Sequence, residues 1–131
     1  MTPQREQTAL FLKKASADEK VLETLLRAKN TAPEMLGFLC QQAAEKYLKA
    51  VLTHFEITFP RTHNLRFLAD LLTDHNHPLP NECLEIDSWT PYGTGYRYDD
   101  VPDDLQFDSL AAHGRLKALQ KWAVELITGT A

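Results

Sequence analysis

The segment with the clearest binding chemistry is a single arginine flanked by two tyrosines. Arg97 lies between Tyr96 and Tyr98 in the run TPYGTGYRYDDVPDD, whose glycines and prolines predict a long loop. A guanidinium group can hold a phosphate through two parallel hydrogen bonds, and a tyrosine ring can stack on a nucleobase. The alternative is that Arg97 pairs with one of the aspartates that follow it, while the tyrosines cover the end of the protein core.

Three further side chains suit a charged ligand. His63, in PRTHNLRFL, could exchange a proton near neutral pH or bind a phosphate. The Thr-His-Asn sequence around it is also typical of a helix start, where such side chains cap free N–H groups. Lys46 and Lys49 could face a ligand or a partner protein, or they could be solvated and pair with Glu45.

Other kinds of site find little support in the spacing of the residues. The pair His75 and His77 resembles half of a metal site, but no third ligand follows at a telling distance. The aspartates after Tyr98 lack the alternation of a calcium loop. Cys40 and Cys83 are predicted to be free thiols. We therefore expect no metal, no cofactor and no catalytic residue that spacing alone could identify.

Length and charge limit the class of protein. The chain has 131 residues, which predicts a single domain over residues 1–131. Its net charge of −4 disfavours an extended surface for nucleic acid, although a small local site is compatible with it. No apolar run is long enough for a membrane span, and the first residues lack the apolar core of a signal peptide. These features predict a cytoplasmic protein.

A helix over residues 31–55 is the element around which the others are expected to pack. Thr31 and Glu34 have the spacing of a capping box at its start. Apolar residues cover most of its circumference, so it should have neighbours on several sides. The narrow strip expected to remain polar and exposed consists of Gln42, Glu45, Lys46 and Lys49.

The rest of the chain also has helical patterns. A first long helix is predicted over residues 4–28 and a short third helix over 65–72, starting near Thr62 or Asn64. Pro80 should open a fourth short helix, and Asp108 should cap a last helix that ends near Ile127. Inward positions are expected at Cys83, Leu84, Ile86 and Trp89 in the fourth helix, and at Leu110, Leu116, Leu119, Ala123, Leu126 and Ile127 in the last. The fold class is all-α, an antiparallel four- to five-helix up-and-down bundle.

Three segments in this order resemble the HEPN domain family of small prokaryotic helical proteins. They are QQAAEKYLKAVL at residues 41–52, PRTHNLRFL at 60–68 and YRY at 96–98. The resemblance implies a helical bundle that is commonly a homodimer and is often paired with a small nucleotidyltransferase. Some members of the family are metal-independent RNases of toxin–antitoxin systems, and others have been proposed to bind nucleotides.

The RNase members carry an arginine followed four to six residues later by a histidine. None of the six arginines of this chain has a histidine at that spacing. The sequence therefore favours a binding module, either for a nucleotide or as the partner subunit of a nucleotidyltransferase. The alternatives are an RNase with a degenerate Arg/His site and a purely structural dimerisation module.

Overall fold

The structure is a computed structural model, and it describes residues 2–93 and 107–130. Within these residues the chain forms five α-helices and two 3₁₀ turns and no strand, as the sequence predicts for an all-α protein. The elements in order are α1 (Pro3–Ala28), α2 (Pro33–His54), α3 (Leu65–Asp74), η1 (Asn81–Cys83), η2 (Ile86–Trp89), α4 (Thr90–Gly93) and α5 (Ser109–Thr128). No helix in the described part of the chain combines the length and apolarity needed to cross a membrane.

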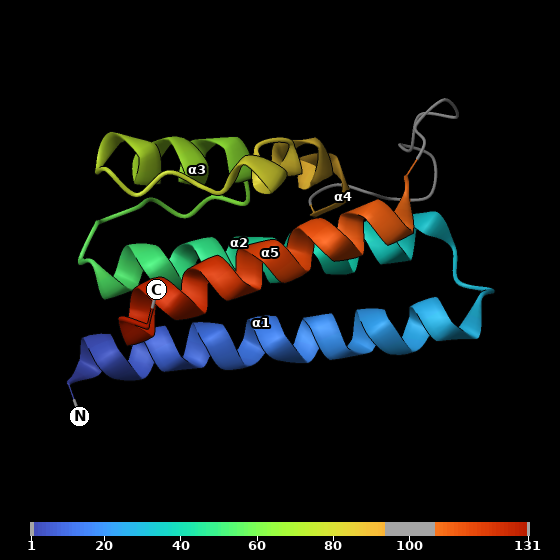
Figure 1. Cartoon of the computed structure of the whole chain (residues 1–131), viewed down its shortest axis with the longest axis horizontal. Coiled ribbons are helices and arrows are strands. Elements are labelled where there is room, and N and C mark those ends of the chain that lie inside the picture. The colour runs from blue at the N-terminus through green and yellow to red at the C-terminus, as the bar shows by residue number, and fades with distance from the viewer. Residues whose placement is uncertain (1, 94–106, 131) are drawn as a thin grey trace.

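The two long N-terminal helices pack against each other in opposite directions, as predicted. The hydroxyl of Thr2 accepts a hydrogen bond from the Arg5 N–H at 3.2 Å and so caps α1, whose first residue is a proline. The helix continues without a break to Ala28, and Lys29 ends it with a left-handed backbone (φ +64°). Figure 1 shows α1 along one edge of the molecule and α3 along the opposite edge, with α2 and α5 between them.

Helix α2 is the central element, in contact with α1, α3, α4 and α5. The capping box predicted at its start is wrong. The N-cap residue is Ala32, whose methyl group cannot accept a hydrogen bond, and the Thr31 hydroxyl instead donates to the Leu25 carbonyl at 3.3 Å. The short connection from α1 therefore uses Thr31 to close the turn rather than to cap the helix.

The segment after α2 crosses the molecule, and α3 then runs in the same direction as α2. The Asn64 side chain caps α3 by accepting from the Phe67 N–H at 3.1 Å, which confirms one of the two predicted caps. The start of α3 lies near Gln41, whose side chain bonds the His63 carbonyl, and the chain just beyond its end lies near Phe55, where the His77 ring stacks at 3.8 Å.

The fourth predicted helix is replaced by two 3₁₀ turns that lead into the single turn of α4. Cys83, Ile86 and Trp89 are buried as expected. Leu84 is 63% exposed, because the tighter 3₁₀ winding does not bring every third and fourth residue to the same inward face.

The last helix has the predicted boundaries. The Asp108 carboxylate accepts from the Ala111 N–H at 3.1 Å, and Gly129 ends the helix with φ +72°. The helix runs in the same direction as α2 (Figure 1) and buries Leu116, Leu119 and Ala123. Leu110 was expected to face inward but is 79% exposed, since it lies in the first turn, before the helix reaches the core.

Candidate functional site at Glu45 and His63

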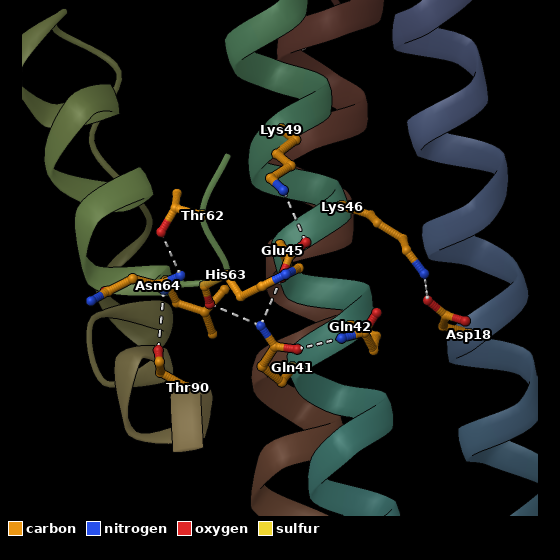
Figure 2. Close-up of polar contacts among 11 residues, drawn as sticks. Asp18, Gln41, Gln42, Glu45, Lys46, Lys49, Thr62, His63, Asn64 and Thr90 are labelled. Carbon is orange, nitrogen blue, oxygen red and sulfur yellow. Dashed lines mark hydrogen bonds and ion pairs between the residues drawn. The ribbon is translucent and has the colours of Figure 1, made fainter. Parts of the chain in front are cut away.

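The structure brings two of the predicted site residues, His63 and Lys49, onto the same carboxylate, that of Glu45. One oxygen, Oε1, lies 2.8 Å from His63 Nδ1 and accepts from Gln41 Nε2 at 2.9 Å. The other oxygen, Oε2, accepts from Lys49 Nζ at 3.0 Å. Figure 2 shows these side chains converging between α2 and the segment that leads into α3.

Glu45 is a buried acid, not part of an exposed polar strip as the sequence suggested. Its exposed fraction is 5%, and that of Gln41 is 0%. Burial alone would raise the pKa of the Glu45 carboxyl, but the hydrogen bonds from Gln41, Lys49 and His63 outweigh burial and lower the pKa. The group is therefore a carboxylate at neutral pH, and its charge is balanced inside the protein.

The backbone around His63 is fixed by α2, by α4 and by a contact within its own segment. Gln41 of α2 donates to the His63 carbonyl at 3.0 Å. The Thr62 hydroxyl accepts from the Asn64 N–H, and the Thr90 hydroxyl of α4 accepts from the Leu65 N–H, both at 3.1 Å (Figure 2). These contacts hold the imidazole in one place. Capping of α3, the alternative role considered for His63, is performed by Asn64 instead.

The His63 side chain is 56% exposed although its Nδ1 is bonded to a buried acid. A carboxylate at Nδ1 favours the tautomer with the proton on that nitrogen, which leaves Nε2 as an acceptor or base. In the described part of the chain Nε2 has no partner. The imidazole is thus oriented from within the protein and presents its other nitrogen to solvent.

The two lysines proposed as ligand contacts have partners inside the protein. Lys49 is only 13% exposed, and its ammonium bonds Glu45 and lies 5.8 Å from the centre of the Phe59 ring. Lys46 forms an ion pair with Asp18 of α1, and Figure 2 shows it turned toward α1, away from His63. Lys46 therefore joins α2 to α1, whereas Lys49 bonds a residue of its own helix.

Three of the predicted residues, Tyr96, Arg97 and Tyr98, lie outside the described residues. Among the described residues, Arg61 is the exposed cation nearest to His63 in the sequence, and it forms no ion pair with any other described residue. Arg61 was not among the site residues predicted from the sequence. Gln41 and Glu45 were not among them either, although the spacing of Gln41, Glu45 and Lys49 at successive steps of four would have placed them together on one face of the helix.

A cavity of about 240 Å³ is lined by residues of α3, η1, η2 and the segments next to them, with Arg66 and Asp70 among its lining residues. None of the predicted site residues lines it. At the Glu45 and His63 site, the imidazole is the exposed part, and the buried, ionised Glu45 carboxylate lies on its interior side.

Comparison with known proteins identifies the family. No curated protein and no solved structure matches the chain. The family model of the HEPN domain matches residues 8–122, which is most of the chain. The matched range includes α2, His63 and the segment that carries Arg97. The chain therefore belongs to the HEPN domain family.

Proposed function

We propose that this HEPN protein is a binding module for a nucleotide, with the exposed edge of His63 as part of the phosphate site. The observation that supports the proposal most directly is the contact between His63 Nδ1 and Glu45 Oε1 at 2.8 Å. A histidine fixed in this way loses little side-chain freedom when a ligand binds at Nε2, because the protein has already ordered it. Most exposed histidines have no such support.

Arginines would supply the charge. Arg61 stands two residues before His63 with no ion pair among the described residues, and Arg97 carries the resemblance to the Arg-Tyr element of the family. A guanidinium binds a phosphate by two hydrogen bonds and keeps its charge at any physiological pH. Tyr96 and Tyr98 are the candidates for stacking on the base.

An RNase is the second candidate, and the same pair of residues supports it. A carboxylate that holds Nδ1 of a histidine leaves Nε2 as a general base, which is the arrangement that proton transfer from a ribose hydroxyl needs. Against this candidate stands the missing histidine four to six residues after any arginine. We therefore place binding ahead of cleavage.

Pairing with a small nucleotidyltransferase is the part of the proposal that depends on family membership alone. Co-expression with a candidate nucleotidyltransferase, followed by gel filtration of the purified mixture, tests it. One peak that contains both chains supports a partner subunit. Separate elution at micromolar concentrations contradicts it. A purely structural module would bind neither the second protein nor a nucleotide.

Titration calorimetry with AMP and with ATP tests the nucleotide site. The wild type should bind at least one of them, and His63→Ala and Arg97→Ala should each reduce the affinity tenfold or more, about 1.4 kcal/mol. Arg66→Ala is the matched control, because Arg66 is an exposed arginine whose charge is already paired with Asp70 and Asp87. An equal loss in Arg66→Ala would mean that the effect is general electrostatics and not a site.

An RNA cleavage assay on the same proteins separates the two candidates. The binding proposal expects no cleavage by the wild type. Cleavage that disappears in His63→Ala while the circular dichroism spectrum is unchanged would replace the binding proposal by the RNase candidate. The absence of both cleavage and nucleotide binding would contradict both.

A further inference from the structure

A second polar cluster joins α1 to α5 away from the site at His63. Lys117 of α5 bonds two carboxylates of α1, Glu19 Oε2 at 2.7 Å and Glu23 Oε2 at 3.0 Å. His113, one turn before Lys117, has its Nε2 at 3.0 Å from the same oxygen of Glu23. The hydroxyl of Tyr47 on α2 donates to the other oxygen of Glu19 at 2.7 Å.

The cluster lies at the border between core and solvent. The Glu19 side chain is 5% exposed, those of Glu23 and His113 are each 28% exposed, and that of Lys117 is 50% exposed. Hydrogen bonds from Lys117 and His113 lower the pKa of the Glu23 carboxyl, and the bonds that Lys117 donates to Glu19 and Glu23 raise the pKa of its ammonium. Three elements thus enclose a place where a positive charge is stabilised by two acids.

Three of these side chains have the composition and proximity of a metal site. Each of Glu19, Glu23 and His113 offers one ligand atom, and these three atoms lie within 4.8 Å of one another. Tetrahedral ligands about 2.0–2.2 Å from a Zn²⁺ ion lie roughly 3.3–3.6 Å apart, so the three need only small side-chain rotations to surround an ion. The ammonium of Lys117 already occupies the position between the two carboxylates.

We propose that Glu19, Glu23 and His113 bind a divalent transition-metal ion, and that the Lys117 ammonium takes the place of the ion in the metal-free protein. Metal binding would therefore exchange the Lys117 ammonium for the metal ion at the same position. Because half of the Lys117 side chain is exposed and its stem is flexible, the ammonium can move into solvent when the ion enters. Tyr47 keeps its hydrogen bond to the oxygen of Glu19 that faces away from the ion and so orients that ligand.

The donor set selects the class of metal. One imidazole and two carboxylates suit Zn²⁺, Ni²⁺ or Fe²⁺, whereas Mg²⁺ and Ca²⁺ prefer oxygen ligands alone. Three protein ligands leave at least one position for water. The ion would bridge α1 and α5 and would stabilise the folded protein by mass action, since the unfolded chain does not bring residues 19, 23 and 113 together.

The test uses the whole purified protein with Zn²⁺ as the probe and Mg²⁺ as the comparison. The wild type should bind about one Zn²⁺ by calorimetry and should melt at a higher temperature with Zn²⁺ but not with Mg²⁺. His113→Asn and Glu23→Gln should each weaken Zn²⁺ binding tenfold or more. Lys117→Gln should tighten it, by about threefold or more, because the competing cation is gone.

Controls separate this cluster from the other possible ligands. His75→Asn with His77→Asn removes the histidine pair of the turn after α3 and should leave Zn²⁺ affinity unchanged. NMR of the imidazole nitrogens in the wild-type protein should show that Zn²⁺ shifts the His113 signals first, a measurement that needs no variant to fold. Unchanged Zn²⁺ affinity in His113→Asn, or tightening that fails to occur in Lys117→Gln, would overturn the proposal. Failure of the wild type to bind Zn²⁺ would do so too, and would leave the cluster as an ion-pair network only.

Discussion

Gly37 of α2 lies directly under the ring of Tyr92, so close that a Cβ atom on it would be 2.5 Å from Cδ1 of the tyrosine. Tyr92 is 3% exposed, and its ring also meets that of Phe107 at 5.3 Å in an edge-to-face arrangement. The residue is thus glycine because α4 packs against this turn of α2, one helical turn before Gln41. The contact ties the chain on both sides of residues 94–106 to the helix that carries the candidate site.

Replacing this glycine by alanine should destabilise the protein. Overpacking of a filled core typically costs about 1–3 kcal/mol, which exceeds the gain of up to ~1 kcal/mol that alanine gives in a helix. Gly114→Ala is the matched control, because a Cβ there meets nothing within 4 Å. Urea denaturation should show a loss for Gly37→Ala and a gain for Gly114→Ala. A gain in both would mean that Tyr92 moves aside at no cost.

Much of the fold could be predicted from the sequence, because the information is local. Helical periodicity, the caps at Asn64 and Asp108 and the stop at Gly129 depend on neighbours within one or two turns. The failures lie where the chain departs from a regular α-helix. Thr31 bonds a carbonyl of α1, and Leu84 lies outside the core because the chain winds as 3₁₀ turns.

The site was harder to predict than the fold, because its contacts join segments that are distant in the sequence. Glu45 looked like a solvated residue on a polar strip, and only the crossing of the chain at His63 buries it. The spacing of Gln41, Glu45 and Lys49 could have shown that they share a face. It could not have shown that a histidine from another segment completes their hydrogen bonds. The pairing of Glu23 with His113 likewise joins residues ninety positions apart.

Core and site residues of α2 should differ in what they contribute to stability. Leu48 is fully buried, so Leu48→Ala should lower the free energy of unfolding by about 2–5 kcal/mol. If Lys49 were solvated, which the sequence left open, Lys49→Ala would cost little. Because Lys49 bonds the buried Glu45 carboxylate, we now expect a loss of about 1–3 kcal/mol. Lys20→Ala, on the exposed side of α1, should change stability by less than about 0.5 kcal/mol. Equal effects of Lys49→Ala and Lys20→Ala in a denaturant titration would refute the assigned ion pair.

Both cysteines should be unreactive in the folded protein. Burial raises the pKa of the Cys40 and Cys83 thiols to about 12, with the negative charges of Glu19 and Glu82 adding to the effect. Since the thiolate is the reacting form, a thiol reagent such as DTNB should label neither residue at neutral pH. Addition of denaturant should expose two thiols per chain. Rapid labelling of the native protein would show that α2 or η1 opens far more often than its burial implies.

Self-association remains a prediction, but one of its two supports has gone. The apolar circumference of α2 was expected to need a second subunit, yet Leu48, Val51 and Leu52 are fully buried within one chain. What remains is the resemblance to a family whose members are commonly homodimers. We still expect a two-fold homodimer at micromolar concentration, which light scattering would report as twice the 14.9 kDa of one chain. If light scattering reports the mass of a single chain at concentrations well above micromolar, that result would count against the dimer.

Acid should destabilise the protein through Glu45, and the sign follows from its lowered pKa. A carboxyl whose folded pKa lies below its unfolded value, ordinarily near 4.5, stabilises the folded state above that value and loses this contribution as the pH falls through the folded pKa. The free energy of unfolding should therefore decline below about pH 4.5, where protonation of Glu45 breaks its bonds to Lys49 and His63.

A variant can assign that decline to one residue. Glu45→Gln cannot ionise, so it should be less stable than the wild type at neutral pH and approach it as the pH falls. Glu34→Gln is the control, because Glu34 is an exposed acid in the first turn of the same helix and should leave the pH profile unchanged. Glu23, whose pKa is also lowered, contributes to the decline in both proteins and so cancels in the comparison. A stability difference between wild type and Glu45→Gln that stays constant from neutral pH into acid would show that Glu45 is not the ionised acid that holds His63 in place.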